Sequence, residues 1–222
     1  YPMAKLQLSQ PTLFLLFGFP GAGKTYFARQ LCEELQTAHV QGDRVRFELF
    51  EDPRYDRKEN EIIGNIMDYM TEEFLQAGIS VVYDTNAMRA KQRRELRELA
   101  RKCKAQTVLV WFQIDIESAF ERVAKRDRRK VDDKYTTPLD RTSFNAVIAG
   151  MQNPTQIEDY MVVSGKRTFQ TQRSAVIKKL YDRGLLQSEQ ATSGLAKPNL
   201  VNLIPNATGG RVDPSRRNIT IH

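Results

Sequence analysis

Residues 18–25 read Gly-Phe-Pro-Gly-Ala-Gly-Lys-Thr, and this stretch constrains the fold more than any other part of the chain. A backbone can turn its N–H groups onto phosphate oxygens only where no Cβ blocks the approach, which explains the repeated glycines. Lys24 then reaches the β- and γ-phosphates, and the Thr25 hydroxyl is the expected ligand of Mg²⁺. The motif therefore predicts a P-loop with the binding residues Gly18, Pro20, Gly21, Ala22, Gly23, Lys24, Thr25 and Tyr26.

The residues on either side of this motif supply the context that a P-loop requires. Thr12 to Phe17 form a short apolar run, which is typical of a parallel strand covered on both faces. After Tyr26, apolar residues recur at helical spacing, namely Phe27, Ala28, Leu31 and Leu35. Because a strand, a glycine-rich turn and a helix N-terminus agree, we interpret the motif as a nucleotide site and not as a turn without a ligand.

Strand-like and helix-like segments alternate along the rest of the chain. Apolar runs predict further strands over residues 38–42, 79–83, 107–114 and 160–163. Apolar spacing and helix breakers predict helices over residues 44–50, 62–75, 89–104, 117–126, 139–151 and 174–181. This alternation favours an α/β chain of the P-loop NTPase fold, with a five-stranded, mainly parallel sheet and helices on both faces.

The composition divides the chain into two regions. Residues 1–187 are predicted to form one domain, in which the highly charged, Arg-rich segment at about 126–137 forms a lid over the bound phosphates. From Ser188 onward the chain is rich in Gln, Ser, Thr, Asn, Gly and Pro. This tail, residues 188–222, contains apolar pieces at 200–204 and 218–221 and is expected either to be flexible or to form a small hairpin.

The charge balance and the apolar content limit the classes of protein that fit. The chain has 34 basic and 27 acidic residues, a net charge of +7, which favours polyanionic partners. No run of about 18 apolar residues marks a membrane span, and residues 1–10 lack the apolar core of a signal peptide. With only two cysteines a disulfide scaffold is not indicated. We therefore expect a cytoplasmic protein that does not bind membranes.

Four groups of residues, taken in order, resemble the kinase domain of polynucleotide kinases and of zeta-toxin-like and other small P-loop kinases. They are Gly18 to Thr25, Gln41 to Arg46, Tyr83 to Asn86, and Arg122 with Arg126 ahead of Pro138. The resemblance covers roughly residues 13–186 and implies an AAA-type ATP-binding kinase family. The chain departs from this family in two ways. Gly42 precedes Asp43, which matches the general base, whereas a basic residue often stands at that position in the family. The phosphatase half of some polynucleotide kinases has no counterpart.

The resemblance implies roles for three residues near the ends of the second and third strands. Asp43 matches the general base that accepts the proton of the attacking hydroxyl. Arg46 matches an arginine that helps to hold the acceptor. Asp84 matches an active-site carboxylate that orients this arginine or acts on the Mg²⁺ through water. The alternative is that both aspartates cap helices, with Asn86 the better candidate cap of the second one.

The resemblance also implies roles for three basic residues. Arg122 and Arg126 match lid arginines that bridge the phosphates in the transition state, although Arg126 also fits a surface arginine in a disordered loop. Lys166 follows the last predicted strand and matches a contact to the nucleobase. The basic helix at 89–104 is interpreted as a solvated face, because acidic residues alternate with its arginines. His39 is interpreted as a strand residue without a role as base or metal ligand.

Together these residues predict a phosphotransferase that uses ATP and Mg²⁺. The expected acceptor is a hydroxyl group, with the 5′-hydroxyl of a polynucleotide as one candidate. The alternative within enzymes is a zeta-toxin-like or other small-molecule kinase. The alternative from another class is an ATP-hydrolysing or nucleotide-binding module that phosphorylates no acceptor. The residues expected to perform the chemistry are Lys24, Asp43, Arg46, Asp84, Arg122 and Arg126.

Overall fold

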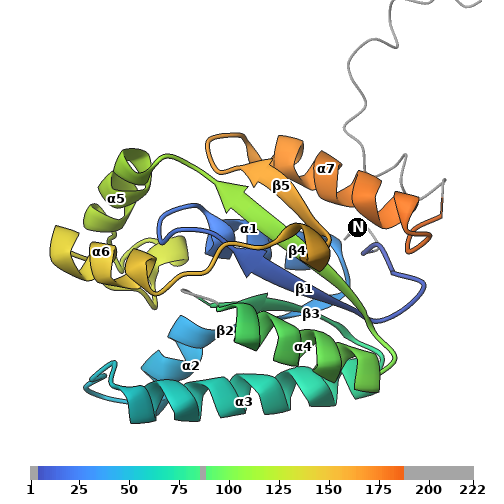
Figure 1. The fold of residues 1–222 in the computed structure, drawn as a ribbon, viewed down its shortest axis with the longest axis horizontal. Coiled ribbons are helices and arrows are strands. Elements are labelled where there is room, and N and C mark those ends of the chain that lie inside the picture. The colour runs from blue at the N-terminus through green and yellow to red at the C-terminus, as the bar shows by residue number, and fades with distance from the viewer. Residues whose placement is uncertain (1–4, 86–88, 188–222) are drawn as a thin grey trace, which may run out of the picture.

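The computed structural model describes residues 5–85 and 89–187, and every structural statement below refers to this part of the chain (Figure 1). The polar tail predicted over residues 188–222, with its two apolar pieces, lies outside the described residues. Asn86, the candidate helix cap, lies outside them as well.

Within the described residues, five strands form one sheet, and every pairing is parallel. They are β1 (Thr12–Phe17), β2 (Thr37–Gln41), β3 (Ser80–Asp84), β4 (Gln106–Gln113) and β5 (Tyr160–Ser164), in the order β2-β3-β1-β4-β5. The predicted α/β fold is confirmed, and the sheet is parallel throughout. All six residues of β1 are buried, as expected for a central strand with helices on both faces.

Helices connect these strands. They are α1 (Lys24–Glu34), α2 (Gly42–Leu49), α3 (Arg57–Gln76), α4 (Ala90–Lys102), α5 (Ile116–Ala124), α6 (Arg141–Ala149) and α7 (Phe169–Asp182). Two short 3₁₀ turns, η1 (Val131–Asp133) and η2 (Gln156–Glu158), lie in the connections that flank α6. Each helix predicted from apolar spacing is present, with its ends shifted by a few residues.

The starts of two helices exclude the alternative that Asp43 and Asp84 are helix caps, and the start of a third extends a predicted helix. Gln41 is the N-cap of α2, so Asp43 lies inside the first turn and does not cap the helix. Arg89 is the N-cap of α4, so Asp84 is not a cap either. Helix α7 contains the predicted residues 174–181 and begins earlier, at Phe169, because the Thr168 side chain caps it by accepting a hydrogen bond from the N–H of Thr171.

Alternate residues of β1 point to the two faces of the sheet and define two apolar layers. Phe14 and Leu16 belong to the cluster formed with α1 and α7. Leu13, Leu15 and Phe17 belong to the cluster formed with α3 and α4. Figure 1 shows α7 on one side of the sheet and α3 and α4 on the other, while α5 and α6 lie together beside it. The sheet is therefore covered on both faces.

The parallel topology places the predicted site residues at one edge of the sheet. The P-loop follows β1, Asp43 follows β2, and Asp84 is the last residue of β3. In the register of the sheet Gln41 pairs with Asp84, and Phe17 pairs with Trp111. Ligand sites of open α/β sheets lie at this carboxyl edge. None of the described helices combines the length and the apolar character that a membrane span requires.

Candidate active site

The P-loop lies tightly against the elements that follow it in the sheet. Gly21 has a φ of +85°, and a Cβ on it would lie 2.2 Å from the carbonyl oxygen of Ala119 in α5. A Cβ on Gly18 would lie 2.6 Å from the carbonyl oxygen of Phe112 in β4. Both glycines are therefore required by close packing of backbone on backbone as well as by the turn itself.

Lys24, the first residue of α1, is buried beneath this loop. Its Nζ donates hydrogen bonds to the carbonyl oxygens of Gly18, at 2.7 Å, and Phe19, at 2.9 Å. Burial lowers the pKa of the Lys24 ammonium to about 8, and the nearby Asp84 carboxylate offsets part of this effect. The ammonium is thus held in a dry position, where a phosphate group would stabilise its charge.

A pocket of about 160 Å³ lies beside the P-loop and is lined by residues that are far apart in the sequence. We call it the P-loop pocket. Its lining residues are Gly21, Gly23, Lys24, Thr25, Tyr26, Asp43, Asp84, Thr85, Arg122, Arg126, Asp132, Asp133 and Thr136. The structure thus brings together five of the six residues expected to perform the chemistry. The exception is Arg46, which does not line the pocket.

The Asp43 and Asp84 carboxylates both line the P-loop pocket, and the charge of Asp84 acts on Asp43. Asp84 is 4% exposed at the end of β3, and Asp43 is half-buried in the first turn of α2. Burial raises the pKa of Asp43 and the charge of Asp84 raises it further, while the Arg126 guanidinium opposes both effects. A carboxylate with a raised pKa is a better proton acceptor than an ordinary aspartate, which suits a general base.

His39 is a contact of this site that the sequence interpretation missed. Its Nε2 lies 3.0 Å from Oδ2 of Asp84, close enough for a hydrogen bond. In the sheet His39 pairs with Val82, two residues before Asp84, and β2 and β3 are neighbours. The sequence signal was the even spacing of His39 and Gln41 on one face of β2, but it becomes useful only when the strand order is known.

The two predicted lid arginines differ in their surroundings. Arg122 is exposed, and its Nη1 donates to the carbonyl oxygens of Gly165, at 2.9 Å, and Gly21, at 3.3 Å. Arg126 is half-buried, and its Nη1 donates to the carbonyl oxygen of Thr137 at 3.2 Å. Burial lowers the pKa of Arg126, while Asp43 raises it. Arg126 is therefore directed into the site, and the alternative of a free surface arginine is wrong.

Contacts on both sides hold the predicted lid, residues 126–137, over the pocket. On one side the Asp132 carboxylate accepts a hydrogen bond from Nε of Arg29 in α1, at 2.9 Å. On the other side the Tyr135 ring meets Phe47 of α2 edge to face, with centroids 5.4 Å apart. The Arg44 guanidinium lies 5.6 Å from the centroid of the Tyr135 ring. The sequence interpretation did not identify these anchors.

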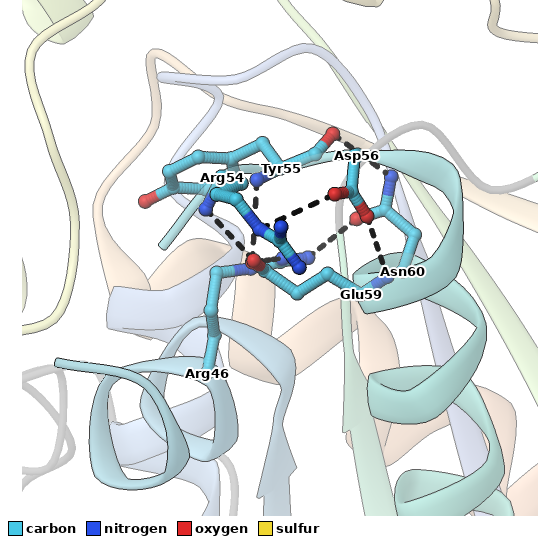
Figure 2. A network of polar contacts seen from close by, with 6 residues as sticks. All are labelled: Arg46, Arg54, Tyr55, Asp56, Glu59 and Asn60. Atoms are coloured by element: carbon cyan, nitrogen blue, oxygen red, sulfur yellow. Dashed lines mark hydrogen bonds and ion pairs between the residues drawn. The ribbon is translucent and has the colours of Figure 1, made fainter. Parts of the chain in front are cut away.

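Arg46 lies in a polar network between α2 and the start of α3 (Figure 2). Its guanidinium forms an ion pair with the buried Glu59, and its Nη2 donates to Oδ1 of Asn60 at 2.6 Å. It also stacks over the Tyr55 ring, 4.6 Å from the ring centroid. Oε2 of Glu59 accepts from the N–H of Arg54 at 2.7 Å. Arg46 thus fixes α2 to α3, and the role in holding the acceptor stays a prediction.

Lys166 faces a different pocket from the one that holds the other predicted residues. Its Nζ forms an ion pair with Oδ2 of Asp115, at 2.5 Å. Both residues line a second pocket of about 510 Å³ at the carboxyl ends of β1, β4 and β5, which we call the strand-end pocket. The contact of Lys166 with a nucleobase stays a prediction.

The P-loop pocket offers the donors that Mg²⁺ prefers. Mg²⁺ is bound in kinases by one or two oxygen donors of the protein together with waters and substrate phosphates. The Thr25 hydroxyl and the carboxylates of Asp43 and Asp84 line the pocket and fit this pattern. Among the described residues no cluster of three His, Cys, Asp or Glu side chains forms a metal cage. The donor set therefore suits a metal that arrives with the nucleotide.

Comparison with protein families and curated proteins gives two matches. A family model, AAA_33, described as an AAA domain, matches residues 13–154. The chain is 21% identical over 135 residues to the L-seryl-tRNA(Sec) kinase of Methanococcus maripaludis, covering 57% of this chain and 53% of that kinase. The match therefore spans about half the length of that relative.

Two solved structures share the fold. Kti12 of Chaetomium thermophilum in complex with ADP-AlF3 has a TM-score of 0.59 at 15% identity, over 79% of this chain and all of that chain. A chain of the Pnkp1/Rnl/Hen1 RNA repair complex has a TM-score of 0.54 at 20% identity, over 64% of this chain and 44% of that chain. At these identities the likeness concerns the fold alone.

Proposed function

The chain belongs to the AAA_33 family of AAA domains, here as a P-loop kinase domain, and from that premise we propose that it transfers the γ-phosphate of ATP to a hydroxyl acceptor. The observation that carries this proposal is the P-loop pocket, which joins a buried lysine, two carboxylates and two arginines. Phosphoryl transfer requires chiefly positioning and charge stabilisation, and this set of groups supplies both.

The P-loop and the first turn of α1 bind the phosphates of ATP. Backbone N–H groups of the loop and the N-terminus of α1 face the phosphate oxygens. The Lys24 ammonium contacts the β- and γ-phosphates, and Thr25 and Asp84 are the residues that would hold Mg²⁺. When bound, Mg²⁺ neutralises charge on the phosphate oxygens.

Asp43 acts on the acceptor. Its carboxylate accepts the proton of the acceptor hydroxyl as that oxygen bonds to the γ-phosphorus. The bond from the γ-phosphorus to the oxygen shared with the β-phosphate then breaks, and ADP leaves. The raised pKa of Asp43 makes it a stronger base, and the Asp84 carboxylate, within hydrogen-bond distance of His39, lines the same pocket.

The lid supplies the positive charge for the transition state. Arg122 and Arg126 line the pocket from α5 and from the segment that follows it. The developing charge lies on the equatorial oxygens of the transferred group, where two guanidinium groups give the largest stabilisation. The anchors of the lid on α1 and α2 keep Arg126 over the site.

We propose the 5′-hydroxyl of a polynucleotide as the acceptor. The net charge of +7 favours a polyanion. The relative named as an L-seryl-tRNA(Sec) kinase and the RNA repair complex both connect this fold with RNA by their names. These observations support the acceptor class, and the chemistry of the P-loop pocket is the same for any hydroxyl.

The experiment is transfer of label from γ-labelled ATP with Mg²⁺ to a panel of acceptors. The panel contains 5′-hydroxyl DNA and RNA, nucleosides, nucleotide sugars and aminoglycosides, and phosphate release is recorded in parallel. We expect labelled oligonucleotide with the wild type and none with Lys24→Ala. Label on a small molecule alone would overturn the acceptor class, and phosphate release without a labelled acceptor would overturn the kinase function.

A further inference from the structure

The strand-end pocket is larger than the P-loop pocket and takes no part in the chemistry described so far. Its volume of about 510 Å³ lies within the range of small-molecule sites. The two pockets have no lining residue in common. Its walls combine apolar rings with amide groups, notably Phe17, Phe19, Trp111, Gln113, Met151 and Asn153.

The strand-end pocket borders the end of the P-loop where the γ-phosphate lies. Gly18 and Phe19 line the pocket, and their carbonyl oxygens accept the hydrogen bonds of Lys24 Nζ. Because this lysine contacts the β- and γ-phosphates, Gly18 and Phe19 lie beyond the γ end of the nucleotide. An acceptor in line with the transferred group approaches from this end.

The base of ATP lies in the opposite direction. The α-phosphate side of the P-loop is the first turn of α1, at Thr25 and Tyr26, on the sheet face that α1 and α7 cover. Phe17 and Trp111 belong to the apolar layer on the other face, with α3 and α4. The strand-end pocket is therefore on the acceptor's side of the P-loop.

The walls of the pocket have the chemistry of a nucleobase site. The Trp111 ring is half-buried and offers apolar surface to a planar ring, while the buried Phe17 ring supports it edge to face at a centroid distance of 5.9 Å. The exposed Gln113 and Asn153 present amide donors and acceptors for the edge of a base. The Lys166 ammonium at the rim is paired with Asp115, which compensates its charge, so the polar contacts of the pocket come from the neutral amides. In this assignment Lys166 belongs to the acceptor's pocket and not to the base of ATP.

The distance between Asp43 and this pocket suits an oligonucleotide. Asp43 follows β2, and the pocket lies at the ends of β1, β4 and β5. Two strand spacings separate β2 from β1 and three separate it from β4, roughly 10 to 14 Å at about 4.8 Å each. A nucleoside with its hydroxyl at Asp43 is too short to fill the pocket, whereas a later nucleotide of a chain reaches it.

We propose that the strand-end pocket binds a nucleobase of the polynucleotide acceptor, downstream of the nucleotide whose 5′-hydroxyl is phosphorylated. This inference rests on the proposed function, because it names how the same acceptor is held. It assigns Trp111 as the stacking surface, with Phe17 behind it, and Gln113 and Asn153 as the polar contacts. The acceptor preferred by this protein is then a single strand, whose bases are free to leave a stack.

The sequence contains one tryptophan, so its fluorescence reports on this pocket. The first measurement is the Trp111 emission of the whole protein during titration with a 5′-hydroxyl hexathymidylate without ATP. We expect saturable quenching, since a stacked base quenches the indole. ATP with Mg²⁺ alone is expected to give no such quenching. Quenching by ATP alone would assign the pocket to the nucleotide base and overturn the proposal.

Asn153→Phe is the variant that tests the site itself, because a ring at this exposed position fills the pocket. It is expected to abolish quenching by the hexanucleotide and to remove a roughly tenfold preference in KM for hexanucleotide over mononucleotide acceptor. The matched control is Ile157→Phe, at a 96% exposed position of η2 that lines neither pocket. The control is expected to retain both effects.

The two readouts separate this inference from the proposed function. If oligonucleotides are phosphorylated but neither quench Trp111 nor respond to Asn153→Phe, the base pocket is wrong and the kinase stands. If no oligonucleotide is phosphorylated but quenching occurs and Asn153→Phe removes it, the pocket stands and the assigned acceptor fails. Equal quenching in the wild type and in Asn153→Phe overturns the pocket in either case.

Discussion

Buried charges occur in two regions, beside α4 and in the P-loop pocket, and their pKa shifts run in opposite directions. On the face covered by α4, Arg93 is fully buried and donates to both carboxylate oxygens of Glu158, at 2.7 and 2.9 Å. Burial alone disfavours the charge of Glu158, but the hydrogen bonds from Arg93 and others outweigh it and lower its pKa to about 2. At the P-loop pocket the same kind of burial raises the pKa of Asp43 and lowers that of Lys24 to about 8.

The difference lies in how the charges are compensated. Arg93 and Glu158 neutralise each other in a bidentate ion pair, and the Arg93 guanidinium also stacks 5.0 Å from the centroid of the Phe17 ring. At the P-loop pocket Lys24 donates to two backbone carbonyl oxygens, and among the described residues it forms no direct ion pair with Asp43 or Asp84. Shifts toward the neutral form at a cleft are typical of functional sites, whereas shifts toward the charged form are typical of structural pairs.

Asp43→Asn tests the functional side most severely. An amide cannot accept the proton of the acceptor hydroxyl, so kcat is expected to fall about 10⁴-fold while the Kd for ATP changes little. Glu48→Gln, the same change on an exposed face of α2, serves as the control and is expected to be neutral. Transfer at more than a tenth of the wild-type rate in Asp43→Asn would remove Asp43 from the role of base.

Arg126→Ala tests whether the lid stabilises the transition state. We expect kcat to fall about 10³-fold and ATP affinity to fall much less, because the guanidinium interacts with charge that develops during transfer. Arg129→Ala changes an arginine of the same segment that is 90% exposed and paired with Asp127. This control is expected to keep its activity. An effect of Arg126→Ala on ATP affinity alone would place the residue outside the lid role.

Glu158→Gln tests the structural side. The change removes the carboxylate charge that the buried Arg93 contacts in Glu158 and is expected to lower the free energy of unfolding by about 3 kcal/mol, a factor of about 10². Denaturant unfolding measures it. The double variant Arg93→Met with Glu158→Gln is expected to recover part of this loss, since a packed apolar side chain then replaces the buried guanidinium charge. An unchanged free energy of unfolding in Glu158→Gln would show that this ion pair stabilises the fold no more than a surface salt bridge does.

The sequence predicted local features of the fold well. The P-loop, the strand before it and the amphipathic helices all depend on residues close together in the chain, so periodicity and turn chemistry reveal them. Asp43 and Asp84 were also predicted, from the resemblance to small P-loop kinases, and they lie near the ends of parallel strands, which meet at one edge of the sheet. The structure places both carboxylates in the P-loop pocket, as that rule requires.

The contacts that the sequence did not reveal join distant segments. The pair of Arg46 and Glu59 forms only because the chain between α2 and α3 turns back, with Tyr55 at a φ of +57°. The hydrogen bond between His39 and Asp84 requires β2 beside β3, and the anchor of Asp132 on Arg29 requires the lid to fold back over α1. Strand order and lid position are properties of the whole domain and leave no local pattern in the sequence.

The smallest expected effect is the pH dependence of stability, which distinguishes the ion pair of Arg93 and Glu158 from the P-loop pocket. The pKa of Glu158 is about 2 in the folded chain and about 4.3 in an unfolded one, so its stabilisation is complete above this higher value. It is lost as the pH falls toward 2, because the unfolded chain then binds the proton first. Between pH 6 and pH 3 we expect this group to contribute a loss of about 2 kcal/mol of unfolding free energy.

Since Gln does not titrate, the difference in unfolding free energy between the wild type and Glu158→Gln should shrink over the same interval. A constant difference would mean that the ion pair does not lower the pKa of Glu158, and the contrast with the P-loop pocket would then rest on burial alone.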